Sequence, residues 1–119
     1  MKKILFIACG AFLIFSMSGC IPGENPHLTI QSHTWRKEWT GVSDWWEGEI
    51  TGQAVNDGNV ILSYAEVWAL FYDSSGTVIE KKPDNTFNLK IGEVWQFSII
   101  FYVSSEPDHY EINVGTLSY

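Results

Sequence analysis

The chain has 119 residues, of which 45% are hydrophobic and 15% aromatic, and its formal net charge is −7. This length is enough for one domain with a sizeable core. So acidic a chain repels phosphate backbones, which argues against a nucleic acid as partner.

The first twenty residues have the layout of a secretory signal peptide. Lys2 and Lys3 precede the apolar run 4–15, and small residues stand before Cys20. This order of a charged start, an apolar stretch and a small-residue cleavage site is typical of secretory signals. The apolar run is shorter than the roughly 20 residues that cross a bilayer. An ordinary secretory signal with a coincidental cysteine is the alternative.

The segment Ser16-Met17-Ser18-Gly19-Cys20 resembles the lipobox of bacterial-type lipoprotein signals. Met17 stands where that family prefers leucine. The resemblance implies cleavage before Cys20 and acylation of this cysteine. It therefore implies a cell-envelope protein that is anchored by lipid to the extracytoplasmic side of a membrane.

Removal of residues 1–19 would leave 100 residues with a net charge of −9. Cys9 would leave with the signal and Cys20 would carry lipid, so the remaining domain would have no disulfide and would depend on its core. No polybasic segment adds attraction to anionic lipid, so attachment would rest on the acyl chains. The prolines and glycine in 20–27 predict a short tether, and 28–119 are expected to form a single domain.

Short segments of alternating or apolar sequence follow one another along the remaining chain. The pattern is clearest in 60–72 and 94–103, where large apolar residues recur at every second position. The segment from Trp35 to Trp46 fits neither a strand nor a helix period and is predicted to be a loop. Turns are expected at 73–76, 82–85 and 106–108. The predicted strands are 27–33, 47–56, 60–72, 77–81, 87–89, 94–103 and 110–114.

No segment shows sustained helical periodicity. Six to seven short strands separated by turns rich in Gly, Asp, Asn and Pro predict an all-β fold, an antiparallel β-sandwich. The pattern alone leaves a small barrel open.

Residues 50–103 resemble the FxLYD domain, an immunoglobulin-like family of prokaryotic envelope proteins. The matching segments are Gly52-Gln53-Ala54-Val55-Asn56, Ala69-Leu70-Phe71-Tyr72-Asp73, Gly76 with Val78 and Ile79, and Ile91-Gly92-Glu93 with Phe97. Ala69 replaces the first Phe of the name-giving motif, and Phe71 replaces its Leu. The resemblance implies an immunoglobulin-like sandwich.

The motif residues are expected to act structurally. Asp73 would accept hydrogen bonds from the following turn, and Asn56 would bind loop backbone in the same way. Asp57-Gly58 is a local signal for a tight hairpin, whereas the resemblance makes it the connection between the two sheets, which is the reading adopted. The motif residues are Gly52, Asn56, Phe71, Tyr72, Asp73, Gly76 and Gly92.

Two groups of aromatic residues are candidate contact surfaces. Exposed Trp rings stack on sugars or bind apolar side chains of partner proteins. The alternative is that the first group covers the open end of the sandwich core. The first group is Trp35, Trp39, Trp45 and Trp46, and the second is Trp68, Leu70 and Tyr72, a face that could pair with a like domain.

Other polar clusters carry no predicted chemistry. Asp44, Glu47 and Glu49 are interpreted as a solvated acidic face, and the loose calcium-loop spacing around Asp73 as a plain turn. His27, His33 and His109 lack a third ligand and a nucleophile at any recognisable spacing. We therefore expect no metal, no cofactor and no catalytic residues.

The sequence predicts a non-catalytic, lipid-anchored β-sandwich that binds another envelope component, with Trp35–Trp46 as the contact segment. A glycan- or cell-wall-binding module that uses exposed Trp rings is the alternative. Protein binding predicts a contiguous apolar patch, and glycan binding predicts coplanar exposed Trp rings.

Overall fold

The structure, a computed structural model, describes residues 23–119. The predicted signal 1–19 and Cys20 therefore lie outside the described residues. Within 23–119 every regular element is a strand, and no helix is long and apolar enough to cross a membrane. The strands are β1 (Leu28–Trp39), β2 (Trp46–Asn56), β3 (Leu62–Tyr72), β4 (Val78–Leu89), β5 (Val94–Val103) and β6 (His109–Ser118).

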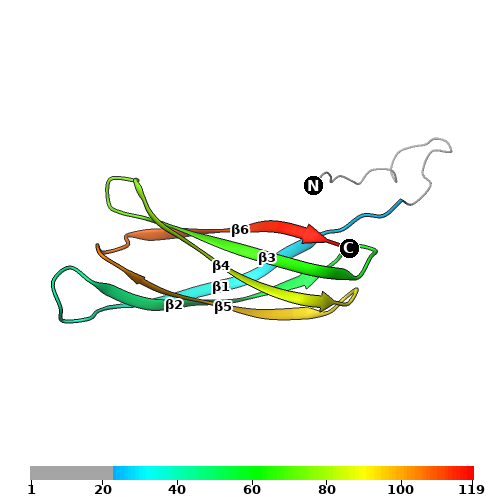
Figure 1. The fold of residues 1–119 in the computed structure, drawn as a ribbon, viewed down its shortest axis with the longest axis horizontal. Coiled ribbons are helices and arrows are strands. Elements are labelled where there is room, and N and C mark those ends of the chain that lie inside the picture. Colours follow the sequence, from blue (N-terminus) through cyan, green and yellow to red (C-terminus); the bar gives the residue numbers. More distant parts are fainter. Residues whose placement is uncertain (1–22) are drawn as a thin grey trace.

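The six strands form two antiparallel three-stranded sheets that pack face to face (Figure 1). One sheet has the order β1-β2-β5 and the other β4-β3-β6. This is the arrangement of strands A, B and E against C′, C and F in an immunoglobulin-like sandwich. The predicted all-β, antiparallel sandwich is confirmed.

The core lies between the inner faces of the two sheets. In β3 and β5 every second residue points inward and is buried, as the alternation predicts. The outer face of β3 is half-buried. The buried hydrophobic residues are Leu28, Ile50, Ala54, Leu62, Ala65, Val67, Ala69, Phe71, Leu89, Phe97, Ile99, Phe101 and Val103.

Two glycines on β2 make room for the rings of the neighbouring strand. Gly48 lies opposite Phe101, and a Cβ there would come within 2.6 Å of the Phe101 ring. A Cβ at Gly52 would likewise contact the ring of Phe97 and the carbonyl of Ser32. The two Phe rings therefore pack directly on the backbone of β2. At these positions β2 contributes backbone, and no side chain, to the core.

The prediction of a loop over Trp35–Trp46 is wrong. β1 continues to Trp39 and pairs with β2 up to Trp46, so only residues 40–45 form a connection. Trp35, Lys37 and Trp39 share one face of β1, and their alternation is obscured because a lysine occupies an inward position. When this lysine is counted as an inward-facing residue, the segment shows the two-residue alternation expected of a strand.

The predicted turn at 82–85 is also wrong. The two predicted short strands 77–81 and 87–89 are parts of one strand, β4. Pro83 pairs with Trp68 within it, and a proline without a backbone N–H is tolerated because β4 lies at the edge of its sheet. β5 has the predicted bounds, and β2, β3 and β6 differ from prediction at their ends, β6 most of all, since it extends to Ser118.

The connection after β2 crosses between the sheets. Residues 57–61 link β2 of one sheet to β3 of the other, so Asp57-Gly58 does not form a tight hairpin. This is the connection between sheets that the resemblance to the FxLYD family implies. All strands run lengthwise, so the connections gather at two ends (Figure 1). The tether end holds residues 23–27, 57–61 and 90–93, and the hairpin end holds 40–45, 73–77 and 104–108.

Candidate interaction surface

The four tryptophans of the predicted contact segment do not form one exposed cluster. Trp35 and Trp46 are half-buried and pack against the core. The Trp35 ring lies 4.8 Å from the Tyr110 ring and 6.1 Å from the Phe101 ring, measured between centroids. These two tryptophans therefore cover the hairpin end of the core, which is the alternative that the sequence left open.

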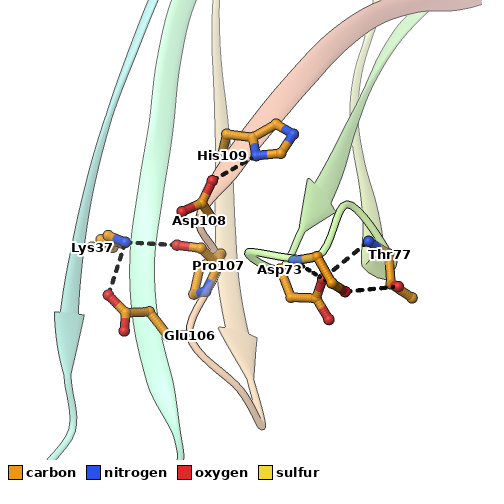
Figure 2. A network of polar contacts seen from close by, with 8 residues as sticks. Lys37, Asp73, Thr77, Glu106, Pro107, Asp108 and His109 are labelled. Atoms are coloured by element: carbon orange, nitrogen blue, oxygen red, sulfur yellow. Dashed lines mark hydrogen bonds and ion pairs between the residues drawn. The ribbon is translucent and has the colours of Figure 1, made fainter.

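Lys37 lies between these two covering rings. Its Nζ is 5.3 Å from the Trp35 ring centroid and 5.6 Å from that of Trp46. The same ammonium donates hydrogen bonds to the carbonyl of Pro107 (2.6 Å) and to Glu106 Oε2 (3.1 Å). Figure 2 shows the Lys37 side chain reaching from β1 to the β5–β6 connection. Its hydrogen bonds hold this connection to β1 across the open side of the sandwich.

Trp39 is exposed just before the 40–45 connection, and Trp45, the last residue of that connection, is half-buried. The Trp39 side chain is 55% exposed, and its indole N–H donates to the carbonyl of Ser43 (2.9 Å). Val42, at the tip, is 62% exposed. Trp45 stacks on the Tyr102 ring with a centroid distance of 4.5 Å and an interplanar angle of 11°.

Two further apolar side chains near this end lie on the outer face of β5, where Tyr102 pairs with Glu47 and Ile100 with Glu49 of β2, whereas Trp39 lies on the inner face of the same sheet with Trp35 and Lys37. Ile100 lies two positions from Tyr102 on that face and is the most exposed large hydrophobic residue of the described chain, at 74%. The backbone N–H of Trp45 donates to the carbonyl of Val42, which fixes the turn that carries both residues. We call this group of side chains the hairpin patch; its residues are Trp39, Val42, Trp45, Ile100 and Tyr102.

The second predicted surface, Trp68, Leu70 and Tyr72, lies on the outer face of the β4-β3-β6 sheet and is half-buried. Polar groups occupy much of it. The Tyr72 hydroxyl donates to Glu111 (2.7 Å), and its ring stacks on His109 with centroids 4.8 Å apart. This face is thus a mixed row of aromatic and charged groups rather than a bare apolar one.

Glu66 organises the other half of the same face. Its carboxylate accepts hydrogen bonds from the Tyr64 hydroxyl (2.5 Å), the Trp68 indole N–H (2.9 Å) and the Thr116 backbone N–H (3.0 Å). These bonds, the one from Tyr64 above all, hold the pKa of Glu66 at about 2. Gly115 stands opposite, where a Cβ would come within 2.6 Å of the carboxylate.

The pairing of β3 with β6 explains why a carboxylate stands here. Ala65 pairs with Leu117 and Val67 with Val114, so β6 carries an extra residue opposite Glu66. Such a bulge leaves a backbone N–H without a partner in the ladder. Glu66 supplies that partner to Thr116, so its perturbed pKa reflects a structural role. The sequence alone offers no signal for this bulge.

The motif residues act on turns and backbone. Asp73 Oδ1 accepts from the backbone N–H groups of Ser75 (2.9 Å) and Thr77 (3.0 Å), as predicted, and hydrogen bonds to Ser75 and Thr77 lower the pKa of Asp73. Gly76 has a φ of 86° and Gly92 a φ of 83°, which only glycine adopts readily. Phe71 is buried in the core.

Asn56 is the buried polar residue of the core. Its amide donates to the carbonyls of Val60 and Leu89, both at 2.9 Å, and its oxygen accepts from the backbone N–H of Gly58 at 3.1 Å. The prediction that Asn56 satisfies loop backbone is confirmed. It closes the tether end of the core, where the backbone groups of Gly58, Val60 and Leu89 would otherwise lose this partner.

The remaining polar clusters stay apart. Glu47 and Glu49 share a face of β2, and Glu49 bonds Ser98. His33 bonds the Tyr110 hydroxyl (2.8 Å) on one side of the sandwich. Asp44 and Glu80 are at the hairpin end, where Glu80 lies near Lys82. Among residues 23–119, no three metal-ligating side chains converge.

The segment before β1 is bound to the β2–β3 connection by contacts that sequence reasoning missed. The Asn25 backbone N–H donates to Asn59 Oδ1 (2.6 Å), and Asn59 Nδ2 donates to the carbonyl of Gly23 (2.8 Å). His27 Nδ1 lies 2.6 Å from Asp57 Oδ1. We call residues 23–27 with 57–59 the tether clamp.

Gly58 and Asp57 are the residues on which the clamp depends. A Cβ at Gly58 would contact the carbonyl of Asn25 and would lie 2.7 Å from the backbone nitrogen of His27. Partial burial tends to raise the pKa of Asp57, but hydrogen bonds from Thr29 and His27, with the charge of His27, outweigh it and lower that pKa. The Asp-Gly-Asn sequence thus serves as a docking loop for the preceding segment.

Comparison with known proteins adds one relative. An uncharacterized protein of Methanocaldococcus jannaschii, MJ0360, is 31% identical over 94 residues, which are 76% of this chain and 65% of the relative. The chain thus spans 65% of the length of that protein, whose name states no activity. No protein-family model and no solved structure matches the chain.

Proposed function

We propose that this protein is a lipid-anchored cell-envelope protein whose sandwich, an immunoglobulin-like domain of FxLYD type, binds another envelope protein through the hairpin patch. The anchor is Cys20. The observation that carries the proposal is the patch itself: a group of exposed apolar residues, with the stacked Trp45–Tyr102 pair among them, at the end of the sandwich opposite the tether. Apolar patches on monomeric domains mark interaction sites.

The position of the patch suits this role. The tether enters at one end of β1, and the 40–45 connection follows the other end. A 12-residue strand spans about 40 Å. A domain anchored at Cys20 would therefore present the hairpin patch well away from the membrane, where a second protein can reach it.

The chemistry of the patch favours protein over glycan. Sugar-binding platforms present flat rings with free faces. One face of the Trp45 ring is occupied by Tyr102, and Trp35 and Trp46 are packed against the core, which leaves Trp39 as the exposed indole of the group. Val42 and Ile100 add aliphatic surface, which a protein partner buries more effectively than a sugar does.

The titratable groups support a non-catalytic role. Where pKa values are shifted, as for Glu66, Asp57 and Asp73, the carboxylates bind a bulge, the tether clamp and a turn. Each of these three carboxylate shifts is therefore explained by a structural contact.

The anchor is tested in cells by labelling with an alkynyl fatty acid. We expect label and membrane fractionation in the wild type, and neither in Cys20→Ser. If the wild type carries no label, the anchoring proposal is wrong.

The partner is tested by crosslinking in native membranes. We expect a specific protein to be captured by the wild type and by the control Val114→Ser, an exposed apolar residue of β6, but not by a folded Trp39→Ala/Val42→Ser variant. Retention on purified cell-wall glycan that the double variant loses, without protein capture, would replace the proposal by the glycan-binding function.

A further inference from the structure

The tether clamp leaves little chain between the proposed anchor and the folded domain. Gly23 is already hydrogen-bonded to Asn59, so only two residues, 21 and 22, separate Cys20 from the clamp, and the chain from Cys20 to Gly23 has three residue-to-residue steps. Three such steps reach at most about 10 Å in any conformation. If Cys20 carries lipid in the bilayer, the clamp must lie at the surface of that bilayer.

The clamp also fixes which end of the domain is brought there. It joins the segment before β1 to the β2–β3 connection through Asn25, His27 and their partners, and Gly58 permits close backbone contact. Because these hydrogen bonds lie at different positions, the sandwich cannot rotate freely relative to residues 23–27. The sandwich can therefore not swing about a loose linker without first losing these contacts.

The tether end carries exposed apolar side chains that no described residue covers. Ile61 is 55% exposed, Ile91 56% and Phe87 65%. Ile61 and Ile91 lie in the two connections of this end, and Phe87 lies near the end of β4, beside Tyr64. Leu62 pairs with Leu89, so the connections that carry Ile61 and Ile91 leave the same strand pair. We call these three side chains the apolar rim.

The charges of the two ends differ in a way that suits a membrane at the tether end. The connections of the hairpin end carry four carboxylates, Asp44, Asp73, Glu106 and Asp108, of which Glu106 is paired with Lys37 of β1 and Asp108 with His109 of β6. The tether end carries three carboxylates and one lysine: Glu24, Asp57, which is paired with His27, and Glu93, which has Lys90 three residues before it. An anionic lipid surface would thus repel the hairpin end slightly more strongly.

We propose that the apolar rim rests on the lipid bilayer and holds the sandwich upright, with the hairpin patch pointing away from the membrane. This inference rests on the proposed acylation of Cys20. The rim is too small to bind a membrane alone, but at the short distance set by the clamp each apolar side chain meets lipid without further cost of association.

The experiment uses the chain from Cys20 onward, coupled chemically through this cysteine to a maleimide lipid in phosphatidylcholine–phosphatidylglycerol bicelles. A lipid with a spin label in its headgroup broadens the NMR signals of nearby amides. We expect amides of 58–61 and 90–93 to be broadened at least about tenfold more than those of 41–44, since the 12-residue β1 separates the ends by about 40 Å.

Two variants separate the rim from the clamp. Ile61→Ser/Ile91→Ser should reduce the broadening at the tether end, whereas Val42→Ser, equally exposed at the hairpin end, should not. Gly58→Ala should spread the broadening over both ends, because the added Cβ would displace the clamped backbone.

Equal broadening of both ends in the wild type, or stronger broadening at 41–44, would overturn the proposal. So would a dimer in sedimentation experiments without lipid that the rim variant abolishes, since a second copy would then be the occupant. Because the lipid is attached chemically, these results are independent of whether cells acylate Cys20, which the fatty-acid labelling measures.

Discussion

Replacing Lys37 by Met should weaken the hairpin end of the sandwich. Methionine keeps the apolar stem but removes the ammonium that bonds the carbonyl of Pro107 and lies over two Trp rings. Pro107 is fully buried, so its carbonyl would lose its lysine partner away from solvent.

The expected cost follows from these contacts. A hydrogen bond from a charged donor contributes about 1.5 kcal/mol or more, and each cation–π contact about 0.5–1 kcal/mol. The pair with Glu106, whose side chain is 56% exposed, adds little. We expect Lys37→Met to lower the free energy of unfolding by about 2–3 kcal/mol, or Tm by roughly 10–20 °C for a domain of this size.

Urea unfolding followed by Trp fluorescence measures this free energy. Lys81→Met, which removes an exposed charge from β4, is the matched control and should stay within about 0.5 kcal/mol of the wild type. Glu106→Gln should cost less than about 1 kcal/mol. If Lys37→Met were as stable as Lys81→Met, the inward lysine would be a packed stem whose charge contributes nothing, and our reasoning would fail.

Three further changes test other parts of the fold. The pKa of Glu66 is depressed from 4.5 to about 2, so the ionised carboxylate stabilises the fold fully above pH 4.5, and this stabilisation is lost as the pH falls from 4.5 to about 2. Glu66→Gln should therefore lower the free energy of unfolding by about 1–2 kcal/mol, a value reduced by solvent screening, and should make stability less dependent on pH in the acid range. Gly48→Ala should cost at least about 3 kcal/mol, because its Cβ would meet the Phe101 ring and the Arg36 carbonyl; a normal urea midpoint would contradict the packing. Asn56→Ala should cost about 3 kcal/mol through three unpaired backbone groups, and faster amide exchange at Gly58 would report the opened core.

The strands that the sequence predicts best are those with inner faces made of large apolar residues. In β5, and in β3 from Ala65 onward, the period of two is maintained, so the extents and faces of these strands agree closely with prediction. The prediction of β1 fails beyond His33 because Lys37 points inward, and the hydrogen-bond partner of Lys37, Pro107, is 70 residues away in the sequence. No local pattern reveals such a partner.

β4 fails for a different reason. Pro83 and Asp84 look like a turn in isolation, and only their position at a sheet edge makes them acceptable in a strand. Asp84 accepts a hydrogen bond from the Ser98 backbone N–H of β5, so it joins the two sheets. The edge position becomes apparent only when the whole sheet order is known.

The candidate surface was predicted in part. The Trp-rich segment indicated where the hairpin end lies. It did not show which Trp rings cover the core and which face solvent, because Trp residues of both kinds lie close together in the sequence. Ile100 and Tyr102, which complete the hairpin patch, come from a strand whose sequence is dominated by its buried face.

The course of β1 has a mechanical consequence. The strand begins directly after the tether clamp and runs without interruption to the hairpin patch. A pull between a membrane anchor and a partner bound at the patch would pass along this one strand, parallel to its length. The load would be carried by covalent backbone, and the ladder to β2 would be sheared as a whole rather than opened bond by bond. A tether that entered at β6 would instead send the same force through the core between the sheets.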